Sequence, residues 1–150
     1  MTHPDLIEFS KSTAKEAGNI LMEHFGKISS FESKSTDIDL VTIADTKSEA
    51  YIIDRIKATF PEHHIIAEES DITYGNSDYR WVIDPLDGTT NFVHNLPIFS
   101  VSIGFQYKEE TLMGVVYNPA VDKCFWAEKN SGAFLNEKSI KITSTNTLSN

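Results

Sequence analysis

The sequence has little cysteine, few basic residues and no long apolar run. Cys124 is the only cysteine among 150 residues, so no disulfide can form within the chain, as is typical of a reducing compartment. Lysine and arginine total 13 against 22 acidic residues. The resulting net charge of −9 argues against a general nucleic-acid surface, which needs clustered basic side chains.

Apolar residues never form a run approaching the roughly 18 that a membrane span requires. The N-terminus, Met1–Asp5, is polar and lacks a basic region followed by an apolar one, so no signal peptide is expected. We therefore expect a cytoplasmic protein that binds neither membranes nor nucleic acids. Its length is sufficient for one domain with a hydrophobic core.

Helical periodicity dominates the first part of the chain. Apolar side chains recur at helical spacing in two segments separated by a more polar stretch. The pattern predicts a helix over 4–26, a short strand over 28–34, a polar loop over 35–41 and a second helix over 42–60.

The rest of the chain favours strands. Predicted strands cover 64–68, 79–84, 99–107, 112–117, 121–127 and 133–135, with a turn at Lys108–Glu110. Two helices followed by mainly antiparallel strands indicate an α+β or layered α/β fold, with the helices packed on the sheet.

The most informative stretch is Trp81–Phe92. Its first three residues resemble a buried strand, which ends at two acids, Asp84 and Asp87. Residues Gly88–Asn91 follow and are well suited to opening a helix. Carboxylates provide the oxygen ligands that Mg²⁺ prefers, and the free N–H groups at a helix start bind anions. A metal beside an anion suggests a phosphate ester as substrate.

Three separated segments resemble the inositol monophosphatases, members of the Mg²⁺-dependent, lithium-sensitive phosphatase superfamily. They are Asp39–Asp45, Ile65–Ser70 and Asp84–Phe92, in the family's order and spacing. Ala67 replaces the glycine that is usual in the second segment. The resemblance implies the sugar-phosphatase fold, shared with fructose-1,6-bisphosphatase.

Family members are longer, and their second half carries a Trp-Asp-x-Ala-Ala/Gly motif that nothing in this sequence matches. We therefore expect residues 1–150 to form the N-terminal metal- and phosphate-binding half of such a domain, without the C-terminal half.

The resemblance also implies a set of metal ligands. Glu68, Asp84 and the backbone carbonyl of Leu86 would bind one Mg²⁺. Asp84 and Asp87 would bind a second, whose remaining ligand lies in the family's second half. Glu69 would support a third ion through water. Taken alone, Asp84 and Asp87 would more often be a turn former and a helix cap than a metal site.

Further roles follow from the same resemblance. Thr89 and Asp45 would form a dyad that orients the attacking water, and Lys34 would lie near that water. The backbone N–H groups of Gly88, Thr89 and Thr90 would bind the phosphate. Without the resemblance, Thr89 would be interpreted as a helix-capping residue, and Asp45 and Lys34 as ordinary surface residues.

The implied function is that of a phosphoric monoester hydrolase. It would release phosphate from inositol monophosphate, or a similar small polyol or sugar phosphate, by direct attack of a metal-activated water. A homodimer is expected of the complete protein. Within the superfamily, 3′-phosphoadenosine 5′-phosphate and histidinol phosphate are alternative substrates. Thr90-Asn91-Phe92 is the form found in the inositol phosphatases.

Other interpretations use different features. A catalytically incomplete domain would bind metal or only dimerise, and would expose apolar sheet surface. Asp37–Val41 fits the nucleophile motif of haloacid-dehalogenase phosphatases, but that motif must follow a hydrophobic strand. His63-His64 could suggest zinc, yet neighbouring strand residues point to opposite faces.

Overall fold

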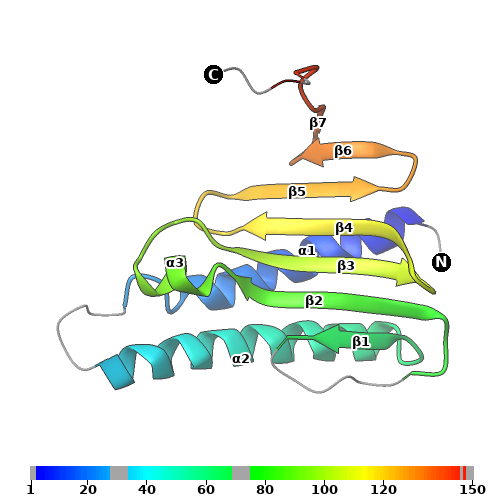
Figure 1. Ribbon diagram of the computed structural model, residues 1–150. Coiled ribbons are helices and arrows are strands. Elements are labelled where there is room, and N and C mark those ends of the chain that lie inside the picture. Colours follow the sequence, from blue (N-terminus) through cyan, green and yellow to red (C-terminus); the bar gives the residue numbers. More distant parts are fainter. Residues whose placement is uncertain (1–2, 28–33, 69–74, 146, 148–150) are drawn as a thin grey trace.

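Two long helices precede a sheet in the computed structural model (Figure 1). The structure describes residues 3–27, 34–68, 75–145 and 147, and side chains within the two long helices from Leu6 and from Leu40 onward. The elements are α1 (His3–Met22), α2 (Lys34–Thr59), β1 (His64–Ala67), β2 (Tyr79–Asp87), α3 (Thr89–Val93), β3 (Ser100–Tyr107), β4 (Glu110–Asn118), β5 (Lys123–Glu128), β6 (Gly132–Leu135) and β7 (Lys138–Ile140).

The strands of the described residues form one seven-stranded sheet in which spatial order follows chain order. Only β1 and β2 pair in parallel, and every later strand pairs antiparallel with its predecessor. The predicted order of two helices followed by a mainly antiparallel sheet is confirmed.

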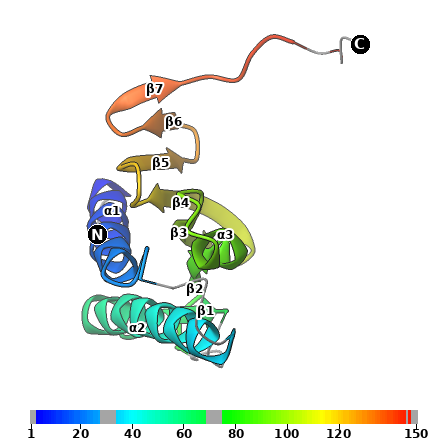
Figure 2. The same cartoon turned by 90° about the vertical axis from the view of Figure 1, so that its left-hand side faces the viewer.

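Helices α1 and α2 lie on the same face of the sheet, as the end-on view shows (Figure 2). Strand β2 illustrates the alternation that results: Trp81 and Ile83 are buried beneath the helices, whereas Val82 between them is exposed on the other face. The core between helices and sheet includes Leu6, Ala14, Ala17, Leu21, Val41, Ala44, Ile52, Ile56, Trp81, Ile83, Val101, Ile103, Phe105, Met113, Val115 and Tyr117.

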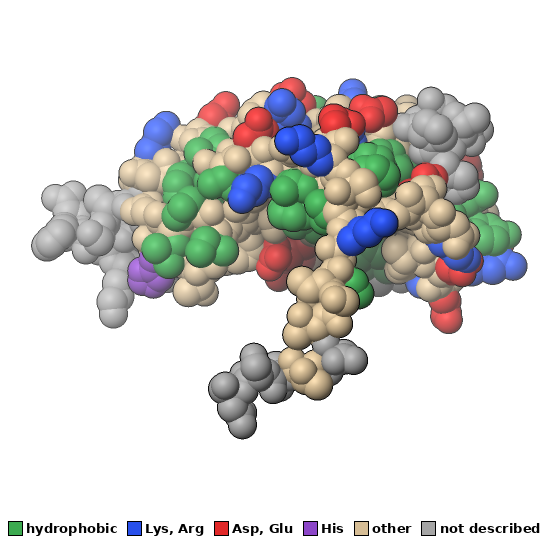
Figure 3. All heavy atoms as spheres, turned by 90° about the horizontal axis from the view of Figure 1, so that it is seen from above, with side chains coloured by type: hydrophobic (Ala, Val, Ile, Leu, Met, Phe, Trp, Pro, Cys, Tyr) green, Lys and Arg blue, Asp and Glu red, His purple; other side chains and the backbone are tan. Residues whose placement is uncertain are grey.

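The face of the sheet away from the helices bears exposed apolar side chains, among them Val82, Val116 and Phe125. Strands β5 to β7 extend beyond the two long helices (Figure 2). Seen from above, apolar side chains are exposed there between lysines and acids (Figure 3).

Two local predictions need correction. Helix α2 already begins at Lys34, so the loop predicted over 35–41 is wrong. Serine, threonine and aspartate are as typical of helix starts as of loops, and polarity alone misled the assignment. Residues 28–33 of the predicted strand lie outside the described residues, and Lys34 is helical. Residues 37–41, whose haloacid-dehalogenase interpretation the sequence did not favour, lie within this helix.

Strand boundaries differ less from prediction. Strand β2 continues past residue 84 to Asp87, Glu110 begins β4 instead of ending the turn, and β7 was not predicted. In the described part of the chain, no helix is both long and apolar enough to cross a lipid bilayer.

Helix α2 allows a matched test of the core. Ile52 is fully buried, whereas Ile43 on the same helix is 43% exposed. We expect Ile52→Ala to lower the free energy of unfolding by about 2–5 kcal/mol, because it removes buried methyl groups and leaves a cavity. Ile43→Ala should change it by less than about 0.5 kcal/mol. Urea unfolding of both variants measures this, and equal effects would contradict the assigned layers.

Candidate functional site

A β-bulge at the end of β2 determines where the two aspartates of the motif point. Asp84 lies opposite Ser102 of β3, and Asp87 lies opposite Ser100. Three steps along β2 therefore match two steps along β3, so one extra residue is accommodated. In a regular strand, residues three apart face opposite sides. The bulge instead brings both carboxylates to the face away from the helices.

The bulge residues between the aspartates are buried, and their polar groups have partners. The Leu86 N–H donates to Asp84 Oδ1 at 3.1 Å. The Pro85 carbonyl accepts a hydrogen bond from the buried Ser48 hydroxyl of α2 at 3.2 Å. The Leu86 carbonyl accepts one from Thr89 Oγ1 at 3.1 Å. The backbone of this irregular segment is thus held at each of these positions.

Strand β1 adds a third carboxylate. Its parallel register pairs Ala67 with Ile83, so the residues that follow, Glu68 and Asp84, are neighbours. The pKa of Asp84 is raised from 3.8 to about 6, chiefly by burial and then by the nearby charge of Glu68, with smaller contributions from a hydrogen bond with Glu68 and the charge of Asp87. The hydrogen bond from the Leu86 N–H acts in the opposite direction. The predicted ligands Glu68, Asp84 and Asp87 therefore lie close enough to interact.

These carboxylates do not converge to ligand distance on their own. Among the described residues, no three histidine, cysteine, aspartate or glutamate side chains are arranged to hold an ion as they stand. An all-oxygen donor set with unfavourable mutual charge fits a hard cation such as Mg²⁺.

Gly88 turns the chain from β2 into α3 in a left-handed conformation, with φ of 91° and ψ of 37°. A Cβ at this position would lie 2.9 Å from the Ile98 carbonyl oxygen. Glycine is thus required both by the backbone angle and by the close approach of the next loop. The first N–H groups of α3 follow directly and have no acceptor within the helix.

Helix α2 approaches the bulge from the helix-covered side. Ser48 contacts the Pro85 carbonyl, and Asp45 precedes it by about one turn on the same buried face. Asp45 is only 7% exposed, so its interpretation as a surface aspartate is wrong. Helix α2 also packs against α3, which carries Thr89. Asp45 and Thr89 therefore lie on contacting elements.

Of the remaining predicted residues, Thr89 and Thr90 lie at the start of α3. The Thr89 hydroxyl donates to the Leu86 carbonyl, one of the predicted ligands. Thr90 is exposed in the first turn of α3. Glu69 and the side chain of Lys34 lie outside the described residues.

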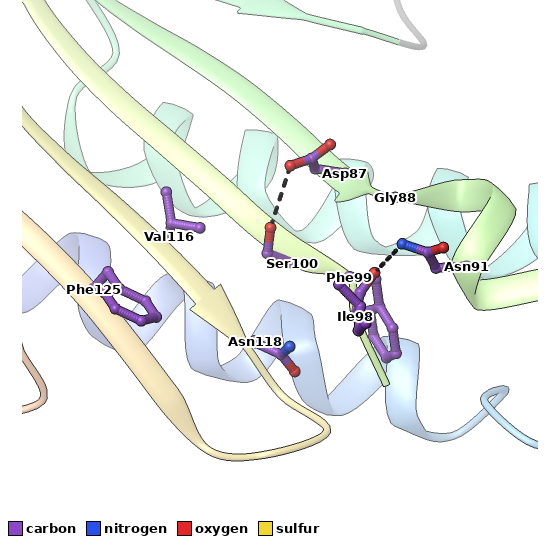
Figure 4. A pocket seen from close by; sticks show the side chains of 9 residues that line it. All are labelled: Asp87, Gly88, Asn91, Ile98, Phe99, Ser100, Val116, Asn118 and Phe125. Carbon is purple, nitrogen blue, oxygen red and sulfur yellow. Dashed lines mark hydrogen bonds between the residues drawn. The ribbon is translucent and has the colours of Figure 1, made fainter. Parts of the chain in front are cut away.

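A shallow cleft of about 290 Å³ opens beside Asp87 on the outer face (Figure 4). Ser100 Oγ lies 3.5 Å from Asp87 Oδ2, and Asn91 Nδ2 donates to the Ile98 carbonyl at 2.7 Å. Val116 and Phe125 form its apolar side. The volume lies at the lower end for small-molecule sites.

Three residues near the site were missed at the sequence level. Ser48 was assigned only to the buried helix face, and Ser100 was not singled out, because its place opposite Asp87 depends on the strand register. Glu49 is 5% exposed and four residues after Asp45. Helical spacing alone could have placed Glu49 and Asp45 together, because residues four apart share a face.

The strand thus bulges between two carboxylates and turns through glycine into a helix, which places oxygen ligands beside free backbone N–H groups. The profile of the inositol monophosphatase family matches residues 4–150. The chain belongs to this family.

Individual relatives agree. Inositol monophosphatase 3 of Solanum lycopersicum is 42% identical over 146 residues, covering 95% of this chain and 54% of that protein. A fructose-1,6-bisphosphatase/inositol-1-monophosphatase of Thermotoga maritima is 39% identical over 139 residues, covering 93% and 54%. The crystal structure of extragenic suppressor protein suhB from Bartonella henselae matches with a TM-score of 0.84 at 34% identity, covering 94% and 55%. The chain spans about half the length of the curated relatives it matches.

Substitution of Gly88 tests the turn. Gly88→Ala should lower the free energy of unfolding by about 1–3 kcal/mol, because alanine is strained at positive φ and its Cβ would crowd the Ile98 carbonyl. Gly104→Ala is the control, since its Cβ would meet nothing closer than 3.6 Å. Chemical unfolding of both variants should separate them, and equal stability of the two would contradict the assigned conformation.

The raised pKa of Asp84 predicts a pH dependence of the metal-free protein. Because folding favours its protonated form, the stability from this group is complete below its ordinary pKa of 3.8 and is lost as the pH rises through about 6. In the presence of a chelator, Asp84→Asn should therefore be more stable than the unchanged protein at pH 7, and the two should converge near pH 4. Urea unfolding across this range measures the difference.

Asp54→Asn provides the control for that series, because it makes the same chemical change at an exposed position of α2. A parallel pH profile for Asp84→Asn and the unchanged protein would refute the inferred repulsion.

Proposed function

We propose that the protein is a Mg²⁺-dependent phosphomonoesterase that hydrolyses inositol monophosphate or a similar small polyol or sugar phosphate. The observation that carries the proposal is the bulge, which directs Asp84 and Asp87 to one face immediately before Gly88 and α3. The names of two relatives, inositol monophosphatase 3 and fructose-1,6-bisphosphatase/inositol-1-monophosphatase, support this class of substrate.

Glu68, Asp84 and the Leu86 carbonyl would hold one ion, Asp84 and Asp87 a second, and Glu69 a third through water. When bound, Mg²⁺ would neutralise the phosphate and lower the pKa of the attacking water. The Leu86 carbonyl already accepts the Thr89 hydroxyl, but a carbonyl oxygen has a second lone pair for a cation. The repulsion that Asp84 experiences from its neighbours would be relieved by this ligation.

The phosphate would bind at the start of α3. The backbone N–H groups of Gly88, Thr89 and Thr90 lie where the chain enters the helix, and such groups lack acceptors within it. The absence of a Cβ at Gly88 allows the ester to approach the backbone. Anion and carboxylate-bound cation would then be adjacent, as hydrolysis of a phosphate ester requires.

Thr89 and Asp45 are proposed to orient the attacking water. The Thr89 hydroxyl would donate a hydrogen bond to the Asp45 carboxylate and accept one from the water, and the buried negative charge would make the hydroxyl oxygen a better acceptor. For this the hydroxyl would exchange its present acceptor, the Leu86 carbonyl, for Asp45. Lys34 would lie near the same water.

Residues 1–150 are proposed to be the metal- and phosphate-binding half of the active protein. The relatives' greater length supports a contribution of further residues to the second metal and to recognition of the alcohol. Homodimerisation, a cytoplasmic location and lithium sensitivity belong to the same proposal. 3′-Phosphoadenosine 5′-phosphate and histidinol phosphate are competing substrates for the assay.

Asp87→Asn tests the metal set. We expect Mg²⁺-dependent phosphate release from inositol 1-phosphate to fall by at least about 100-fold, because loss of a direct ligand should exceed the 10–100-fold typical of its hydrogen-bonding partners. Colorimetric phosphate detection with and without Mg²⁺ measures the rate. The exposed Asp54→Asn, the same chemical change on α2, should leave it unchanged.

Calorimetric titration with Mg²⁺ distinguishes the proposed enzyme from a catalytically incomplete domain. Mg²⁺ binding without phosphate release from any of the three esters would favour the incomplete domain. Near-normal turnover in Asp87→Asn would instead contradict the assignment of Asp87 as a metal ligand.

A further inference from the structure

The bulge lacks part of the support that a regular strand has. Pro85 has no N–H group, so it cannot donate to β3 at the position where the register shifts. Its carbonyl takes no part in the proposed metal and phosphate contacts. It accepts a hydrogen bond from a side chain outside the sheet.

Ser48 provides that contact. It is fully buried on α2, and its hydroxyl donates to the Pro85 carbonyl at 3.2 Å. The contact joins residues 37 positions apart in the sequence and ties the bulge to the helix that also carries Asp45. Because a helix is rigid over one turn, the bond fixes the position of the bulge relative to Asp45.

Ser100 acts on the other side of the bulge. It is 8% exposed on β3, directly opposite Asp87, and its hydroxyl lies 3.5 Å from Asp87 Oδ2 (Figure 4). At 3.5 Å the contact is longer than the roughly 2.5–3.0 Å of an ordinary O–H···O hydrogen bond, so it is weaker than the contact made by Ser48. By engaging one oxygen, Ser100 leaves the other free and limits rotation of the carboxylate.

We propose that Ser48 and Ser100 are positioning residues for the carboxylate site. Ser48 holds the bulge through the Pro85 carbonyl, and Ser100 orients the Asp87 carboxylate. Neither touches the substrate or the metal. The inference rests on the proposed function, because it assigns the two hydroxyls to a metal site formed by Asp84 and Asp87. Hydrogen-bonding partners of this kind orient metal ligands and influence metal affinity.

The test is the dissociation constant for Mg²⁺, measured by isothermal titration calorimetry on the purified protein. Ser48→Ala and Ser100→Ala should each weaken Mg²⁺ binding by about 10–100-fold, with Ser100→Ala at the lower end because its bond is longer. Ser48→Thr and Ser100→Thr retain the hydroxyl and should recover most of the affinity.

Ser10→Ala is the matched control. Ser10 is as buried as Ser48 and also donates to a backbone carbonyl, that of Leu6 at 2.8 Å, but it lies within α1 away from the bulge. The same loss of a buried hydroxyl should leave Mg²⁺ affinity unchanged. Urea unfolding of each variant shows whether stability falls comparably in Ser10→Ala and Ser48→Ala.

The outcomes separate the two levels of the proposal. If the unchanged protein binds Mg²⁺ and both alanine variants bind it equally well, the positioning roles are refuted and the proposed function is unaffected. An equal loss of affinity in Ser10→Ala would likewise refute them, since general destabilisation would suffice. If the unchanged protein binds no Mg²⁺, the positioning roles and the proposed function are both refuted. If Ser48→Ala does not fold, Ser48→Thr and Ser100→Ala still decide, because unchanged affinity in Ser100→Ala overturns its role.

Discussion

The register shift between β2 and β3 is the constraint on which the site depends. The three steps of β2 from Asp84 to Asp87 are accommodated opposite the two steps of β3 from Ser102 to Ser100. Without this extra residue one aspartate would point into the core beneath the helices, where an unpaired charge is costly. With it, both carboxylates point outward, Pro85 and Leu86 fill the inner side, and the chain reaches Gly88 in position to begin α3.

The same geometry has an electrostatic cost. Asp84 lies partly buried between the charges of Glu68 and Asp87, and its pKa is raised to about 6. A protein under selection for stability alone would separate such groups, whereas perturbed carboxylates gather where a cation or a substrate is bound. The cost of the site is offset elsewhere by the core between the helices and the sheet, including the fully buried Trp81 and Ile52.

Much of this arrangement was predictable from the sequence. The remainder could not be predicted, and the reasons are physical. Periodicity identified the long helices and most strands, and the resemblance identified the acids near β1 and β2, because both are local patterns. The prediction of where α2 starts failed because Ser35, Thr36 and Asp37 suit a loop and a helix start equally well. The roles of Ser48 and Ser100 depend on contacts across 37 and 13 residues, which no local pattern contains.

The most direct test of the central claim is the crystal structure of the protein grown with Mn²⁺, a Mg²⁺ substitute that anomalous diffraction locates. We predict an anomalous peak on the outer face of the sheet, bound by carboxylate oxygens of both Asp84 and Asp87, with the Asp84–Asp87 bulge and the Ser48–Pro85 hydrogen bond present. A regular β2 strand with these carboxylates on opposite faces, or Mn²⁺ bound only elsewhere, would contradict it.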